Sequence, residues 1–153
     1  MNGKYEMNQY APSFFQGVPV APSDQVGYEP RPYSYLYNPP NNELTADQSI
    51  SDSISIETDS DFLLFGWYLS LYTGAFQIQL ADSTGYNLQS GLLNSGAISQ
   101  SSSDPTVFSP SHPFPAGGRI QIIQLQDLSG ESNPLQIVFV GEKLFRTQRR
   151  SVQ

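Results

Sequence analysis

The chain has 153 residues, no cysteine, and 14 acidic against 7 basic residues, giving a net charge of −7. This length suits one ordinary domain, and without cysteine neither a disulfide framework nor a thiolate metal site is available. The acidic balance argues against nucleic acid as a partner, because a phosphate backbone repels such a surface. Only 14% of the residues are charged, and the Ser, Gln, Asn, Gly and Pro that replace charge favour strands and turns.

No membrane or export segment is visible. The longest apolar run, FLLFGWYLSLY at 62–72, is shorter than the roughly 20 residues of a membrane-spanning helix. The N-terminal sequence MNGKYEMNQYAPSFFQG has no apolar stretch behind its lysine, as a secretory signal would. We therefore expect a soluble protein without a membrane partner.

Residues 1–43 hold seven of the twelve prolines and six of the nine tyrosines. In YEPRPYSYLYNPPNN at 28–42, each proline lacks an amide donor and pushes the preceding residue toward extended geometry, which excludes a helix or a central strand. With no alternation long enough for a convincing strand, we expect an extended N-terminal arm over 1–43. Aromatic rings with a polar handle suit contact, and prolines reduce the ordering cost of docking. The arm residues expected to bind a neighbouring subunit are Tyr28, Tyr33, Tyr35, Tyr37, Phe14 and Phe15.

From residue 44 the pattern changes to alternation. LTADQSISDSISIET at 44–58 places its apolar residues on even positions, which predicts one or two half-buried strands that bend or break near Asp52. FLLFGWYLSLY is apolar on both faces, as in a strand buried on both sides or covered by another subunit. AFQIQLADSTG at 75–85 predicts a strand ending in a hairpin turn, with a return strand at 86–90.

The C-terminal half continues the alternation after a looser, serine-rich stretch at 91–110. PFPAGG at 113–118 is typical of a turn. RIQIIQLQDL at 119–128 then predicts a strand with Ile120 and Ile122 on one face, and with Ile123 and Leu125 on the other.

LQIVFVGEKLF at 135–145 predicts a last strand buried on both faces. Strand candidates recur about every ten residues, and no window shows a capped helical stripe. We expect an all-β fold: a single antiparallel β-sandwich, jelly-roll-like and of roughly eight strands, over 44–146. A basic tail would follow at 147–153.

Few residues could carry catalysis. His112 is the only histidine, and without a second histidine or a cysteine a transition-metal site is excluded, so we interpret it as a loop residue. Asp82 and Asp127 fall at expected turns, although a glycosidase would also need two acids facing each other across a cleft. We expect no enzyme activity and no cofactor. A small hydrolase using Asp82 or Asp127 is the weakest alternative.

A run of acidic residues precedes and follows the strands near residue 50. It lacks the spacing of an EF-hand calcium loop, and a solvated face that protects a sheet edge explains it better than a metal site. The residues are Glu43, Asp47, Asp52, Glu57, Asp59 and Asp61.

The C-terminal sequence FRTQRRSVQ carries Arg146, Arg149 and Arg150, which we expect to contact a partner. A solubilising tail or a donor of intersubunit salt bridges is favoured over a small patch for phosphate or an acidic partner. Trp67 has two interpretations as well. Its apolar neighbours place it in the core, whereas a sugar-stacking platform would need it exposed.

Three segments, FQIQLADSTGYNLQSG, HPFPAGGRIQIIQLQDLSG and LQIVFVGEKLF, together resemble small β-sandwich structural proteins in the virions of tailed bacteriophages. The shared features cover about half of the chain: an Asp-rich hairpin, a Pro-Phe-Pro-type turn, and a last strand ending in Gly141, Lys143 and Phe145. The resemblance implies a non-enzymatic capsid decoration, cement or minor capsid protein located in the virion, or a subunit at the head-to-tail junction. Its partners would be the major capsid protein or another virion protein, and further copies of itself in a homo-oligomer. A carbohydrate-binding or receptor-binding β-sandwich module is the alternative.

Overall fold

The structure is a computed structural model that describes residues 26–72 and 74–148. The strands are β1 Val26–Tyr37, β2 Glu43–Leu44, β3 Ser49–Ser55, β4 Asp61–Tyr72, β5 Phe76–Ala81, β6 Leu93–Asn94, β7 Thr106–Phe114, β8 Arg119–Asp127 and β9 Asn133–Gln148. Two single-turn 3₁₀ helices, η3 Pro40–Asn42 and η4 Ser95–Ala97, lie between strands. Over these ranges, no helix has the length and apolar character needed to cross a membrane.

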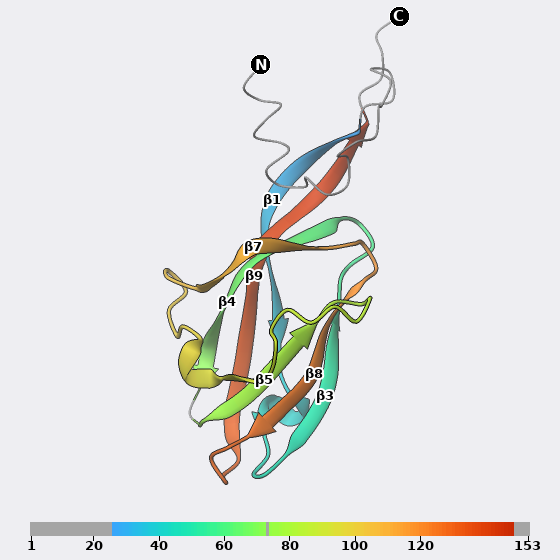
Figure 1. Cartoon of the computed structure of the whole chain (residues 1–153). Helices are drawn as coiled ribbons and strands as arrows, with labels where there is room; N and C mark the ends of the chain where they lie inside the picture. Colours follow the sequence, from blue (N-terminus) through green and yellow to red (C-terminus); the bar gives the residue numbers. More distant parts are fainter. Residues whose placement is uncertain (1–25, 73, 149–153) are drawn as a thin grey trace, which may run out of the picture.

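Two antiparallel sheets pack against each other, which confirms the expected all-β sandwich. One sheet has the order β1-β9-β4-β7, with β2 also paired to β9, and the other has the order β3-β8-β5-β6. Figure 1 shows that β1 and β9 continue together as a two-stranded ribbon beyond the body of the sandwich. The register pairs Val26 with Gln148, so the first and last residues of the two strands lie side by side at the ribbon's end.

One apolar core fills the space between the sheets. Its largest fully buried side chains are Trp67, Phe62, Phe76, Phe114 and Phe139, and the aliphatic residues of β5 and β8 face them. Trp67 stacks on Phe139 with ring centroids 5.9 Å apart, and only 1% of its surface is exposed. Trp67 is therefore a core residue, as its apolar neighbours indicated, and is closed to a sugar.

The expectation of an arm over the whole of 1–43 was wrong from residue 26 onward. Residues 26–37 form β1, which pairs with β9 along its full length. Pro30 and Pro32 are tolerated because β1 is an edge strand, where a missing amide donor can face away from the neighbouring strand. The sandwich therefore begins near Val26 rather than at residue 44. At the other end β9 reaches Gln148, so the expected tail boundary at 147 also moves.

Several strand predictions are confirmed with shifted details. The alternation after residue 44 divides into β2 and β3, and the pairing of β3 with β8 shifts between Ile50 and Asp52, where a bend was expected. The same irregularity changes the phase of β8: Leu125 is fully buried in the core, while Ile123 is 39% exposed. Residues 86–90 contribute one isolated bridge, Ala81 to Asn87, instead of a return strand.

Candidate functional site

Three of the four β1 tyrosines lie on the core-facing side of the sheet, and the fourth lies on the opposite side. Tyr35 and Tyr37 point into the core and are 7% and 4% exposed, whereas Tyr33, on the same face, is 36% exposed. Tyr35 packs edge-on against Phe62, with ring centroids 4.8 Å apart. Tyr28 lies on the opposite face, packed on a small apolar cluster. The structure thus assigns two of the four expected partner-binding tyrosines to the core.

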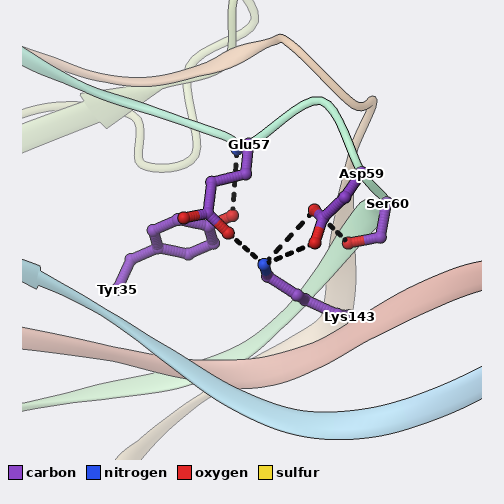
Figure 2. Close-up of polar contacts among 5 residues, drawn as sticks. All are labelled: Tyr35, Glu57, Asp59, Ser60 and Lys143. Atoms are coloured by element: carbon purple, nitrogen blue, oxygen red, sulfur yellow. Dashed lines mark hydrogen bonds and ion pairs between the residues drawn. The ribbon is translucent and has the colours of Figure 1, made fainter.

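Beside these tyrosines, the side chain of Lys143 is buried in a cage of carboxylates and rings (Figure 2). Its ammonium donates to Glu57 Oε2 and to Asp59, whose Oδ2 is 3.1 Å away. It also lies 4.1 Å from the centroid of the Tyr33 ring. The Tyr35 hydroxyl lies beside this cage and accepts a hydrogen bond from the backbone N–H of Glu57 at 3.1 Å. The turn between β3 and β4 is thereby tied to β1 and β9.

The contacts in the cage shift the pKa values of Lys143 and Asp59 so that both stay charged. Burial alone would lower the pKa of Lys143, but the hydrogen bonds to Glu57 and Asp59 outweigh it and raise that pKa above its ordinary value. The hydrogen bond from Lys143 lowers the pKa of Asp59. Lys143 is therefore a firmly charged structural ion, unlike a lysine nucleophile, which needs a depressed pKa.

The sequence carried a signal for this lysine that our predictions left unused. In LQIVFVGEKLF the core-facing residues Leu135, Ile137 and Phe139 occupy odd positions, and Lys143 follows in the same phase. A lysine in the phase of a core face requires an anionic partner. The acidic turn before β4 supplies that partner.

The acidic residues that we expected on one solvated face make separate contacts with different parts of the fold. Asp52 accepts a hydrogen bond from the Tyr37 hydroxyl at 3.0 Å, and Asp61 accepts one from the backbone N–H of Ala116 at 2.9 Å. Glu57 and Asp59 hold Lys143. Within the part of the chain that the structure describes, no three His, Cys, Asp or Glu side chains gather closely enough to hold a metal ion.

His112 lies in β7 and joins the two sheets on the other open side of the sandwich. Its Nε2 is 3.0 Å from Asp82 Oδ2, and its ring stacks on Tyr86 at 5.8 Å with an interplanar angle of 2°. This corrects the prediction of a loop histidine. Asp82 also accepts hydrogen bonds from Thr84 and from the backbone N–H of Tyr86.

Asp82 and Asp127 both shape turns. Burial alone would raise the pKa of each, but hydrogen bonds outweigh it and hold each pKa below its ordinary value. For Asp127 the donors are the Ser129 hydroxyl and the backbone N–H groups of Asp47, Ser129 and Gly130. Low-pKa carboxylates engaged with backbone donors suit turn formation better than general acid catalysis.

The remaining expected contact residues lie near or beyond the ends of the described chain. Arg146 is exposed, and its Nη2 is 3.7 Å from Asp61 Oδ2. Phe14, Phe15, Arg149 and Arg150 lie outside the described residues. No protein-family model, curated protein or solved structure matches the chain.

Proposed function

We propose that this chain is a non-enzymatic structural subunit of a tailed-phage particle, a capsid decoration, cement or minor capsid protein. In this role the sandwich body is a rigid block, and contact with a neighbouring subunit is made from the end of the β1-β9 ribbon. The resemblance of the turn and strand segments to virion β-sandwich proteins supports the proposal. So does the use of charged residues such as Lys143, Asp82 and Asp127 to hold the fold.

The pairing of Val26 with Gln148 is the observation that carries the proposal. Val26 and Gln148, which residues 1–25 precede and residues 149–153 follow in the chain, lie side by side at the end of the ribbon (Figure 1). The first segment contains Phe14 and Phe15, and the second contains Arg149 and Arg150. Aromatic and arginine side chains are enriched at protein interfaces. The two segments joined to this end of the ribbon thus supply apolar and cationic side chains that suit contact.

The fold also narrows the contact segment. Tyr35 and Tyr37 are core residues, so the expected arm residues left for docking are those before Val26, together with the half-buried Tyr28 and with Tyr33, which is 36% exposed. If residues 1–25 form the clamp, β1 can stay paired with β9 while the neighbouring subunit is bound.

Quantitative mass spectrometry of purified particles from the source lysate tests the proposal. The measurement is the copy number of this protein relative to the most abundant coat protein. An equimolar ratio would indicate a decoration role, and only a few copies per particle would indicate a role at the head-to-tail junction. Absence from particles would contradict the proposal. Deleting residues 1–25 should then abolish incorporation while the body stays folded, whereas incorporation at the normal level would exclude this segment as the clamp.

A binding module for carbohydrate or a receptor is a second candidate, favoured by the stack of Tyr86 on His112. Tyr86 is 64% exposed, and the two rings are parallel to within 2°, which makes a flat platform of the kind that sugars stack on. A glycan array with the full chain and with Tyr86→Ala tests it. Binding that the substitution removes would support the module, and the absence of any bound glycan would exclude it.

A further inference from the structure

The edge strands of the two sheets differ in whether another strand could pair with them. In one sheet the edge strands are β1, with Pro30 and Pro32, and β7, with Pro110 and Pro113. Each proline lacks the amide that an added strand would bond. At one edge of the other sheet, β6 is only 2 residues long. The remaining edge is β3, which has 7 residues and no proline, so among the described strands it is the edge best able to accept another strand.

The sequence of β3 reads the same in both directions. SISDSIS has Asp52 at its centre, an isoleucine two positions away on each side, and serine at every other position. If two β3 strands paired antiparallel about a two-fold axis at Asp52, Ile50 of one copy would face Ile54 of the second copy, and each serine would face a serine. Hydroxyl pairs bond across strands, and β-branched residues pack well against cross-strand neighbours. A symmetric contact needs a surface that complements itself, so the strand that matches this edge is β3 of a second copy.

The central outward amide of β3 belongs to Ser53. The backbone N–H of Ile56 donates to the carbonyl of Gly118, next to the start of β8, at 2.8 Å. Because amides alternate in direction along an antiparallel strand, the N–H of Ser53, three residues earlier, points away from β8 and toward the open edge. This N–H donates instead to Asp52 Oδ1 at 2.8 Å.

The carboxylate of Asp52 covers this amide and ties it to the other sheet. While its Oδ1 accepts the hydrogen bond from Ser53, its Oδ2 accepts one from the Tyr37 hydroxyl of β1 at 3.0 Å. An added strand would have to offer Ser53 a neutral carbonyl in place of the carboxylate. Hydrogen bonds to an ionised acceptor are roughly twice as strong as neutral ones, so the exchange is unfavourable.

Charge opposes pairing at the same position. In the symmetric arrangement the Asp52 carboxylates of the two copies would lie directly opposite each other, and like charges placed in this way destabilise a strand pair. One side chain therefore blocks the edge twice, by occupying its central amide and by placing a negative charge on the two-fold axis.

We propose that β3 is a latent self-pairing edge that Asp52 keeps closed. Of the acidic residues that the sequence led us to expect at a protected sheet edge, Asp52 is the one that lies within β3. Its presence confines contacts between copies to other parts of the molecule. The inference is independent of the particle role, because it concerns the isolated protein.

Sedimentation equilibrium of the full chain, over a range of concentrations, tests the proposal. Asp52→Thr removes the carboxylate and leaves a residue that favours strands. At concentrations where the mass of the wild type stays constant, this variant should raise the average molar mass toward twice the wild-type value. Asp52→Asn, which keeps the shape of the side chain and removes its charge, should change the mass in the same direction. The matched control is Asp104→Thr, which removes one negative charge from an exposed loop and should leave the mass unchanged.

A double variant separates the β3 edge from other surfaces. Adding Ser53→Pro to Asp52→Thr removes the amide that faces the open edge. The fold already holds prolines in its edge strands β1 and β7. The double variant should therefore return to the wild-type mass, and the thermal midpoint of each variant shows that it is folded.

Three results would overturn the proposal. One is a mass equal to that of the wild type for both Asp52→Thr and Asp52→Asn at every concentration. Another is an equal rise in mass for Asp104→Thr, as expected if lower net charge alone causes association. The third is a double variant that stays associated, because the contact would then lie on another surface. Counting copies in purified particles remains a separate test of the proposed function.

Discussion

At the scale of single residues, Lys143 shows how a charge is held inside the sandwich. Its side chain is 5% exposed, while those of Glu57 and Asp59 are 54% and 49% exposed, so the cation is buried and its partners face water. Removing the cation leaves two carboxylates that water can solvate. Removing the carboxylates leaves an ammonium without compensation, which is the costlier defect.

We therefore predict that Lys143→Met lowers the free energy of unfolding by about 1.5–3 kcal/mol, the scale of hydrogen bonds to charged groups. Urea unfolding measures this loss. The double variant Glu57→Gln with Asp59→Asn should be less stable than Lys143→Met. The reverse order would show that the carboxylates, not the lysine, carry the unfavourable desolvation.

The same cage predicts a pH dependence. The lowered pKa of Asp59 stabilises the fold above its ordinary value of 3.8, and this contribution is lost as pH falls below that value. The raised pKa of Lys143 stabilises the fold below 10.5, and this contribution is lost as pH rises through the folded-state pKa. The stability difference between wild type and Lys143→Met should thus be largest between these two values and shrink on either side. A difference that is constant with pH would contradict the ion pair.

The Tyr37 hydroxyl makes a second polar contact between the sheets. Burial and the hydrogen bond to Asp52 both raise the pKa of Tyr37. We predict that Tyr37→Phe lowers the free energy of unfolding by about 1 kcal/mol, because Asp52 loses a donor. Tyr33→Phe is the control, since its ring contact with Lys143 needs no hydroxyl, and it should change stability by less than about 0.5 kcal/mol. Equal losses would show that the hydrogen bond to Asp52 adds no stability of its own.

At the scale of elements, periodicity located β4, β5, β8 and most of β9 because each keeps a core face over many residues. It failed at β1, although Tyr33, Tyr35 and Tyr37 alternate in the phase of a strand. The prolines exclude a central strand, and only the place of β1 at a sheet edge makes them compatible with strand pairing. Whether a strand lies at an edge depends on how the whole sheet is assembled, so it could not be predicted from the local sequence.

The phase error in β8 has a similar origin. Ile123 and Leu125 were assigned to the same face, and the extra residue at the irregular pairing reverses the face of everything after it. The Lys143 cage and the Asp82 to His112 contact escaped prediction because they join residues 84 and 30 positions apart in sequence. The burial of Trp67 was predicted correctly because it depends on the apolar residues next to it in the same strand, which the sequence shows.

The close pairing of β4 with β9 depends on a glycine. A Cβ atom at Gly141 would lie 2.0 Å from the carbonyl oxygen of Leu63, a backbone atom that cannot rotate away. We predict that Gly141→Ala lowers the free energy of unfolding by about 3 kcal/mol, at the upper end of overpacking costs. Gly91→Ala is the control, because nothing lies within 4 Å of the added atom, and it should be close to neutral. A tolerated Gly141→Ala would show that the two paired strands separate easily at this position.

At the scale of the whole molecule, polar contacts close both open sides of the sandwich. Tyr35, Tyr37 and the Lys143 cage join β1 and β9 to the β3 side, while His112 and Asp82 join β7 to the turn after β5. The β1 strand takes part in one of these closures. Its removal therefore affects both the sheet and the contact between sheets.

Two truncations separate the fold from the assembly segment. Deleting residues 1–25 should leave a single cooperative thermal transition near the wild-type midpoint, because the described sheet pairings begin at Val26. Deleting residues 1–37 should prevent folding, because it removes Tyr35 and Tyr37 from the core and leaves the β9 edge from Ile137 to Gln148 unpaired on that side. Circular dichroism during heating distinguishes the two. A longer truncation that still melts cooperatively would show that β1 is a detachable arm after all, and it would return Tyr35 and Tyr37 to the contact surface that the sequence first indicated.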